Sequence, residues 1–288
     1  MTRVVLVGVL STAFFFSVGI PRAWAQVEVF GGLTVSLAPP AGVFETDYMP
    51  RLVYGTTTGG RAAHMLTLEA DGRAGFDVGV NWLPNRHVGL QVLVERTGHA
   101  LTGANVDYEL AIDYLARLPP DYVERPYSSR RSLPWPDTTG DMTVWRVGAN
   151  GLARFSGRWV DLTVSGGLVW TRVSGRFEQA GYYEYRLGGH STLFYNDVLL
   201  DMTFDESWQA GFNVGAEAGL RAGRHVAFTA GIRFFGPALE PDVIVGEPLN
   251  FVLFEVPRAD IEAALGGKSA TFDPWGSPVL RFGIRVGF

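Results

Sequence analysis

The feature of this sequence that most limits its fold is a strict alternation of apolar and polar residues, repeated in segments of similar length. A period of two places apolar side chains on one face of a β-strand and polar side chains on the other. Most of the segments hold about 9–12 residues, enough for a tilted strand to cross a bilayer. The segments centre on residues 27–37, 76–82, 88–95, 145–155, 160–170, 212–220, 226–234 and 280–288.

The connections between these predicted strands alternate in length. Turns near 84–86, 156–158 and 223–224 are tight, whereas the connections at roughly 38–72, 97–141, 174–206 and 236–277 are long. Short turns on one side and long loops on the other are typical of a barrel in an outer membrane. Because a strand in lipid cannot leave its edge groups unpaired, the sheet must close. The sequence therefore predicts an all-β fold: a closed eight-stranded antiparallel up-and-down transmembrane β-barrel with long extracellular loops.

The first 25 residues resemble an export signal, so we exclude them from the predicted fold. Arg3 precedes a nearly unbroken apolar run, and Ala23-Trp24-Ala25 supplies a cleavage site before Gln26. We predict a signal peptide over 1–25 and one barrel domain over 26–288. An uncleaved anchor is the alternative, since the run is almost long enough to span. No later apolar stretch reaches the length of a spanning helix.

The composition agrees with a membrane barrel and excludes several other classes of protein. The chain has no cysteine, which excludes disulfides, thiolate metal sites and a cysteine nucleophile. Its net charge of −5 gives no basic footprint for nucleic acid. A soluble sandwich is the alternative, but its polar face would be rich in lysine, and Lys268 is the only lysine.

Aromatic residues also fall at both ends of the predicted strands, as interfacial girdles do: Trp82, Phe155, Trp159 and Phe288 near the short turns, and Trp145, Trp170, Trp208 and Phe234 near the long loops.

The last predicted strand resembles the most specific element of a known family. Its apolar residues Phe282, Ile284, Val286 and Phe288 alternate up to a terminal aromatic. In this respect and in its strand pattern, the chain is similar to small eight-stranded bacterial outer-membrane barrels such as the OmpA transmembrane domain, OmpX and OmpW. The resemblance implies that these four residues are the signal read by the barrel-assembly machinery. It also implies a bacterial outer-membrane location, with both termini in the periplasm.

The polar face of the predicted barrel points into its lumen and is the first candidate site. Five acids and five bases suggest a paired network, because an eight-stranded barrel is just wide enough to be filled by side chains and an unpaired ion there would be costly. Such a network is either a sealed plug or a small gated ion path. By strand parity these residues are Glu28, Asp77, Glu95, Asp161, Glu217, Arg146, Arg154, Arg233, Arg281 and Arg285.

Histidines near the outer rim are the second candidate, because a catalytic triad needs a base beside a nucleophile. His64, His99 and His190 lie in or near the long loops, whereas His87 and His225 follow short turns. His190 precedes Ser191, but adjacent residues on a strand point to opposite faces. No convergent catalytic set is visible, so we predict no catalytic residue and no enzyme activity.

The long loops are the third candidate. The loop at 174–206 carries two arginines against six acids, and the loop at 236–277 carries seven acids. Such acidic tips could hold Ca²⁺ or Mg²⁺ or a basic partner, but no EF-hand spacing is present and simple solvation is the favoured interpretation. Residues 105–114 read as an extracellular strand or a short helix, and 258–267 as a short helix with a glycine cap.

These observations predict an outer-membrane barrel with a structural, surface-recognition or adhesion role and a lumen plugged by charged pairs. A narrow or gated pore for ions or small solutes is the alternative, and an outer-membrane enzyme is the third possibility. No cofactor, metal or nucleic acid is implied. The expected partners are outer-membrane lipid, the assembly machinery and an extracellular ligand or surface.

Overall fold

A computed structural model describes residues 26–36, 41–48, 57–72, 74–105, 108–117, 124–133, 138–186, 193–248, 268–272 and 278–288. The predicted signal peptide 1–25 and the predicted helix 258–267 lie outside these ranges. Within them every regular element is a β-strand. No helix in the described part of the chain is long and apolar enough to cross a membrane.

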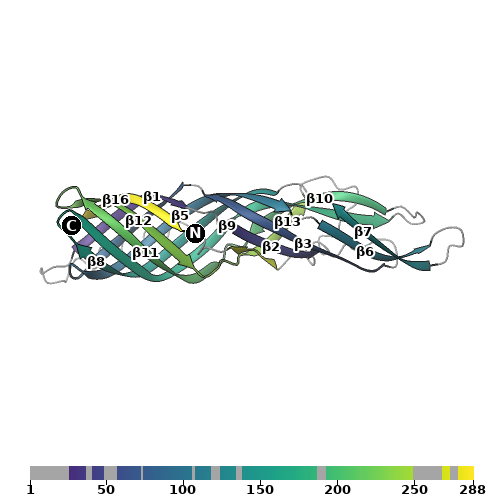
Figure 1. The fold of residues 1–288 in the computed structure, drawn as a ribbon, viewed down its shortest axis with the longest axis horizontal. Coiled ribbons are helices and arrows are strands. Elements are labelled where there is room, and N and C mark those ends of the chain that lie inside the picture. The colour runs from purple at the N-terminus through teal and green to yellow at the C-terminus, as the bar shows by residue number, and fades with distance from the viewer. Residues whose placement is uncertain are drawn as a thin grey trace.

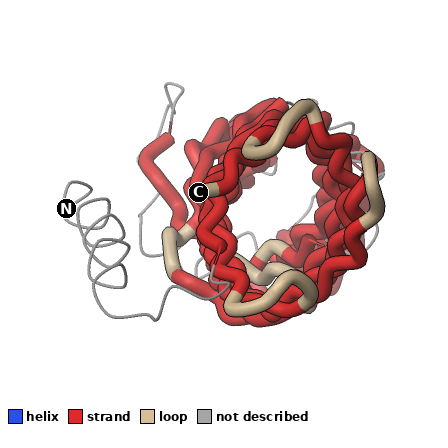
Figure 2. Tube along the Cα trace, turned by 90° about the vertical axis from the view of Figure 1, so that its left-hand side faces the viewer, coloured by secondary structure: helices blue, strands red, loops and turns tan. Residues whose placement is uncertain are grey.

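The strands beside the short turns form a closed ring, the basal section of the barrel (Figures 1 and 2). Each strand pairs antiparallel with its two neighbours, and the first strand closes the ring by pairing with the last, so that Gly32 faces Gly283. The predicted closed eight-stranded barrel is thus confirmed. In order around the ring the strands are β1 (Gln26–Ser36), β4 (Ala74–Leu83), β5 (Val88–Asn105), β8 (Thr138–Ser156), β9 (Val160–Arg186), β11 (Trp208–Arg221), β12 (Val226–Gly236) and β16 (Val279–Gly287).

A second ring, the distal section, continues the barrel away from the short turns (Figure 1). The strands β5, β8 and β9 run through both sections and hold 18, 19 and 27 residues. Two short strands, β14 and β15, are separated by Ala270 alone. β14 pairs with β13 and β15 pairs with β2, which closes the second ring. The remaining distal strands are β2 (Ala41–Tyr48), β3 (Thr57–Gly72), β10 (Leu193–Phe204), β13 (Asp242–Pro248), β14 (Lys268–Ser269) and β15 (Thr271–Phe272).

Much of the chain predicted as long loops is therefore strand. The order β2-β3-β5-β8-β9-β10-β13 repeats the order of the basal strands, so the distal section extends the same barrel wall. A hairpin of β6 (Tyr108–Arg117) and β7 (Glu124–Leu133) extends beyond it and pairs with the start of β3. β6 is a strand, which was one of the two interpretations of residues 105–114.

The inward face of the wall is buried in both sections, but its chemistry differs between them. In the basal section the apolar side chains of β9, such as Leu162 and Leu168, are exposed on the outside, and Thr163 and Ser165 are buried inside. In the distal section of the same strand Val173 and Phe177 are buried, while Arg176 is exposed. An apolar outer wall suits lipid and a polar outer wall suits water.

Aromatic side chains mark the limits of the apolar wall. Trp82, Phe155 and Trp159 are exposed beside the short turns, and Trp170 and Trp208 are exposed at the other limit. The ten residue steps from Trp145 to Phe155 on β8 cover about 33 Å of strand, at about 3.3 Å per residue. At a tilt of about 40° this spans about 25 Å along the barrel axis, the height of the apolar band of an outer-membrane barrel.

Candidate functional site

Each of the eight strands of the basal section contributes at least one ionic side chain to the basal lumen. Strand parity directs them inward, and each of the ten residues predicted for the lumen lies there and belongs to an ion pair. Nine of these ten are buried, and the Glu217 side chain keeps an exposed fraction of 17%. Burial of so many ions requires each to find an opposite charge. The pairs gather around four residues: Glu28, Asp161, Arg281 and Glu95.

Glu28 on β1 is the centre of the first group. Arg154 on β8 holds its carboxylate with two parallel hydrogen bonds, Nη1 to Oε1 at 2.7 Å and Nη2 to Oε2 at 2.6 Å. The amide of Asn81 donates to Oε2 at 3.2 Å, and Arg285 Nε lies 3.6 Å from the same oxygen. A bidentate arginine–carboxylate pair is among the strongest polar contacts in proteins, so this group ties β8 to β1 across the lumen.

Asp161 on β9 is the centre of the second group. Arg285 on β16 donates from Nη2 to Asp161 at 3.0 Å and from Nη1 to Glu217 at 3.2 Å. Arg221 at the end of β11 donates to both oxygens of Asp161, at 3.1 and 2.6 Å. Arg221 is half-exposed at the short-turn end and was not among the predicted lumen residues. Its place at the end of a strand, where parity is hard to assign, explains why.

Arg281 on β16 joins the third group. It pairs with Asp77 on β4 and with Glu217 on β11, and it donates to Thr229 at 3.2 Å. Its guanidinium also lies over the ring of Phe30, 4.5 Å from the centroid. A cation over an aromatic face is stabilised by the ring quadrupole, which compensates part of the lost hydration.

Glu95 on β5 holds the fourth group, nearest the distal section. Arg146 on β8 donates to its Oε1 at 2.6 Å, and Arg233 on β12 lies 3.6 Å from Oε2. Arg146 also covers the ring of Phe235 at 4.1 Å. The five acids and five arginines predicted for the lumen thus sit within a network of pairs.

A chain of uncharged amides crosses the lumen between these ion pairs. Asn213 donates to Asn150 at 2.8 Å, Asn150 to Gln91 at 3.0 Å, and Gln91 to Asn81 at 3.0 Å. Asn81 then donates to Glu28. We did not single out these amides from the sequence, although their inward parity on β11, β8, β5 and β4 was a usable signal. The chain of hydrogen bonds links four strands across the lumen.

Glycines on the inner wall give the long arginines space to lie across the lumen. A Cβ added at Gly219 would lie 2.9 Å from Arg285 Nη2, and one at Gly215 would lie 3.5 Å from Arg233 Nε. Any larger residue at Gly219 would displace the guanidinium that bridges Asp161 and Glu217. These two glycines therefore leave space for the ion pairs.

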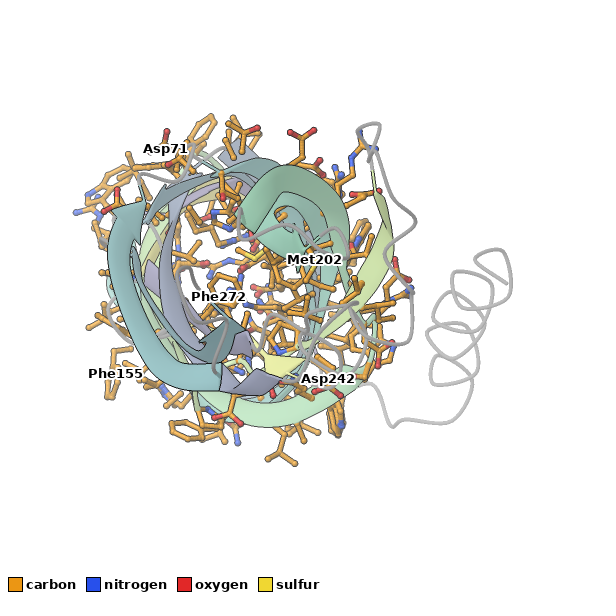
Figure 3. All side chains as sticks on the ribbon, turned by 90° about the vertical axis from the view of Figure 1, so that its right-hand side faces the viewer. Asp71, Phe155, Met202, Asp242 and Phe272 are labelled. Carbon is orange, nitrogen blue, oxygen red and sulfur yellow. The ribbon has the colours of Figure 1, made fainter. Side chains whose placement is uncertain are left out.

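The distal lumen is closed by an apolar core. Aromatic rings from three strands meet there, with the Phe177 and Phe204 centroids 5.4 Å apart and those of Phe204 and Phe272 5.7 Å apart. Figure 3 shows Met202 and Phe272 pointing into the ring, while Asp71 and Asp242 point away from it. The buried core residues are Ala70, Leu101, Met142, Val144, Val173, Phe177, Met202, Phe204, Val243, Val245, Ala270 and Phe272.

His99 lies where the polar and apolar parts of the lumen meet. It is buried on β5, two residues from Thr97, whose hydroxyl lies 3.3 Å from His99 Nε2. Burial, and then the positive charge of Arg146, lower the pKa of His99 to about 4. The imidazole is therefore neutral at physiological pH. A base with this pKa and no carboxylate orienting it in the described contacts is poorly suited to catalysis.

Two other histidines contact carbonyl oxygens at the ends of strands. His87 Nδ1 lies 3.2 Å from the carbonyl oxygen of Arg154, and His225 Nδ1 lies 3.0 Å from that of Gly287. His64 lies on β3, and His190 lies outside the described residues. In the parts of the chain that the structure describes, no three histidine or acidic side chains are grouped as metal ligands are.

The C-terminal strand presents the residues of its predicted assembly signal along the outer wall. Phe282 and Ile284 are exposed, and Val286 is half-buried. Phe288 is the most exposed of the large apolar residues, at 76%, and its amide donates to the carbonyl of Val27 at 2.9 Å. The strand is therefore paired to its end while its apolar side chains remain accessible from outside.

Comparison with known proteins gives structural likenesses alone. No family model matches this sequence, and no curated protein matches it. The outer membrane protein OprG from Pseudomonas aeruginosa aligns with a TM-score of 0.48 and 9% identity, over 92% of this chain and 96% of its own. The attachment invasion locus protein Ail of Yersinia pestis, solved with the heparin analogue sucrose octasulfate, aligns with a TM-score of 0.37 and 9% identity, over 92% and 99%.

The outer membrane protease OmpT from Escherichia coli aligns with a TM-score of 0.40 and 8% identity, over 94% of this chain and 99% of its own. The closed barrel follows from this chain's own strand pairing and does not depend on these likenesses.

Proposed function

We propose that this chain is a bacterial outer-membrane barrel, exported by a signal peptide at 1–25, whose short turns face the periplasm and whose distal section extends outside. The apolar outer wall of about 25 Å, limited by aromatic residues at both levels, supports this location. The reversal of polarity on β9 supports the placement of the distal section in water, since it exposes Arg176 and buries Phe177.

We further propose a structural, surface-recognition or adhesion role without transport or catalysis. The observation that carries this proposal is that the lumen is filled twice, by ion pairs in the basal section and by the apolar core in the distal section. A solute could pass only by disrupting both the ion pairs and the apolar core. The predicted pore is therefore not favoured, and the outer surfaces are what remains for function. Loops held by a rigid scaffold are a common place for recognition.

Planar-bilayer recording of the refolded chain tests the sealed lumen. We expect no stable conductance at neutral pH at any applied voltage, and no conductance from Arg158→Ala, which alters an exposed residue of a short turn. Arg281→Ala removes the cation shared by Asp77 and Glu217, and we expect it to lower stability while the distal core keeps the lumen closed. Regular conductance steps from the unaltered protein would contradict the proposal and favour a pore.

We also propose that biogenesis uses the last strand, with Phe282, Ile284, Val286 and Phe288 presented to the assembly machinery. Their accessibility on the outer wall supports this role. Pulse-labelling of the exported chain in cells measures it, because an assembled barrel resists protease. Equal protease resistance of the unaltered chain and of a chain with all four residues replaced by serine would contradict it.

A further inference from the structure

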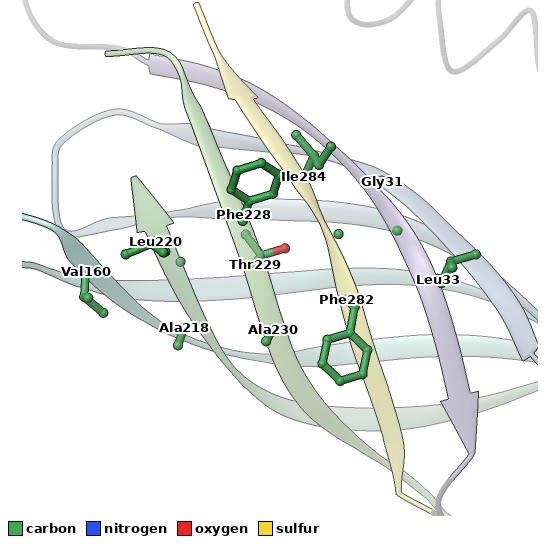
Figure 4. Close-up of a pocket in the computed structure, with 13 residues that line it drawn as sticks. Gly31, Leu33, Val160, Ala218, Leu220, Phe228, Thr229, Ala230, Phe282 and Ile284 are labelled. Carbon is green, nitrogen blue, oxygen red and sulfur yellow. The ribbon is translucent and has the colours of Figure 1, made fainter. Parts of the chain in front are cut away.

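The lipid-facing wall of the basal section carries an open groove of about 870 Å³ over β11, β12, β16 and β1 (Figure 4). Small residues form its floor: Ala218 and Ala230 are paired directly across β11 and β12. Larger side chains stand around them, among them Leu220, Phe228 and Phe282, which are exposed. The groove is thus a depression among the large apolar residues of the wall.

The lining of the groove is apolar throughout its outward surface. Thr229 has the one polar side chain among its lining residues, and that side chain is buried on the lumen side, where Arg281 donates to it. A surface of this kind at membrane depth is complementary to a hydrocarbon chain. The groove alone selects no particular lipid.

The short turns at the base of the barrel carry positive charge. Residues 84–87, 157–159 and 222–225 together hold three arginines and two histidines and no acid. Of these, Arg158 and Arg224 are the exposed arginines of the two turns beside the groove. Leu220 and Phe228, which are paired with each other, border the groove directly above the turn 222–225.

The two turns beside the groove are held together. The amide of Arg221 donates to the carbonyl of Trp159 at 2.9 Å, and the Arg221 side chain is occupied by Asp161. Arg158 stacks over the exposed ring of Trp159, 5.3 Å from the centroid. The stacked ring keeps the Arg158 guanidinium at the level where lipid headgroups lie. No acidic residue in the three turns competes for Arg158 or Arg224.

From this geometry we propose that the barrel binds an anionic phospholipid, with one acyl chain in the groove and the headgroup phosphate between Arg158 and Arg224. The inference rests on the proposed membrane location and adds a ligand to it. Guanidinium groups match phosphate oxygens well, and the uniform positive sign of the turns is complementary to an anionic headgroup. The lipid would cover β11, β12 and β16 beside the seam where β16 closes onto β1.

Native mass spectrometry of the refolded chain in detergent tests the proposal. The probes are dioleoylphosphatidylglycerol and dioleoylphosphatidylcholine, which share acyl chains and differ in headgroup charge. We expect one retained phosphatidylglycerol at collision energies that remove the detergent, and markedly less phosphatidylcholine. Arg158→Gln with Arg224→Gln should weaken phosphatidylglycerol binding about 30-fold, since each basic residue at an anionic surface contributes about 1 kcal/mol. Ala218→Phe with Ala230→Phe should abolish retention by filling the groove.

Matched controls lie on β4, β5 and β8, which contribute no lining residue to the groove. Arg86→Gln alters a turn arginine at the β4–β5 turn, and Ala149→Phe enlarges an exposed alanine of β8 between Val92 and Leu168. Both should retain the lipid as the unaltered chain does. Equal retention of the two lipids, or equal loss in the control variants, would overturn the site. Inorganic phosphate that displaces the lipid would show that headgroup contact alone carries binding and would overturn the role of the groove.

The proposed location is tested separately, by insertion into vesicles and by the mobility shift that folded barrels show before heating. A chain that fails to insert contradicts the proposed function. A chain that inserts and folds, and yet binds both lipids alike, contradicts the lipid site and leaves the location standing. Circular dichroism of every variant shows whether the barrel has formed.

Discussion

Removal of Arg154 is the sharpest perturbation of the basal lumen. Arg154→Met keeps an unbranched apolar stem but leaves the Glu28 carboxylate, itself 4% exposed, without its bidentate partner. The loss of one member of a buried pair costs about 3–5 kcal/mol. Arg285 Nε at 3.6 Å and the Asn81 amide at 3.2 Å remain beside the carboxylate, so we expect a loss near 3 kcal/mol, at the lower end.

The assay is reversible urea unfolding in lipid vesicles, followed by tryptophan fluorescence, which gives the free energy of unfolding. The double variant Glu28→Gln with Arg154→Met should recover most of the loss, because replacing both members of a buried pair is often nearly neutral. Arg86→Gln, which alters an exposed arginine of a short turn, should change stability by about 0.5 kcal/mol or less. A single-variant loss below about 1 kcal/mol, or a double variant as unstable as the sum of its parts, would refute the reasoning.

Three further predictions concern the distal core, its histidine and the terminal residue. Phe177→Ala should cost about 3–5 kcal/mol in urea unfolding and Phe177→Leu much less, because the ring is fully buried among Phe204 and its neighbours; equal losses would argue against a packed core. His99 has a pKa of about 4 when folded, below the unfolded value. Its contribution to the free energy of unfolding should therefore be full above pH 6.5, and about 3 kcal/mol of it should be lost as the pH drops to 4. His99→Gln should remove that part of the pH dependence, and an unchanged titration curve would contradict it. Phe288→Ala should reduce the amount of barrel assembled in cells, measured by protease protection, while the urea midpoint of refolded protein stays within error; a large fall in the midpoint would show a structural role instead.

The basal section could be predicted from sequence because its two faces meet different solvents. Each outward position from Leu280 to Phe288 is apolar, and each inward one is arginine or glycine. Parity therefore placed residues such as Asp77 and Arg233 inside without knowledge of their partners. The partners themselves could not be predicted, since Glu28 and Arg154 are separated by 126 residues, and pairing across a lumen depends on strand stagger and tilt that no local pattern records.

The distal strands were harder to predict for a physical reason. Their alternation persists, but its polarity is reversed, with Val173 and Phe177 inward and Ser174 and Arg176 outward on β9. A search for apolar residues on one constant face therefore stops at Trp170, where the solvent changes from lipid to water. Gly175 follows in the distal part of β9 with a backbone φ of +151°, a conformation that residues with a side chain rarely adopt.

The same change of solvent accounts for two kinds of lumen in one barrel. Where lipid surrounds the wall, the apolar residues of the sequence are used outside, so the interior is left with polar side chains, which must pair: Arg281 with Asp77 and Arg146 with Glu95. Where water surrounds the wall, the apolar residues return inside and pack as a core around Phe204. Both arrangements fill the interior with side chains that stabilise the fold. Because side chains occupy the interior along both sections, we propose that recognition of other molecules takes place on the outer surfaces, from the groove of the basal section to the far end of the distal section.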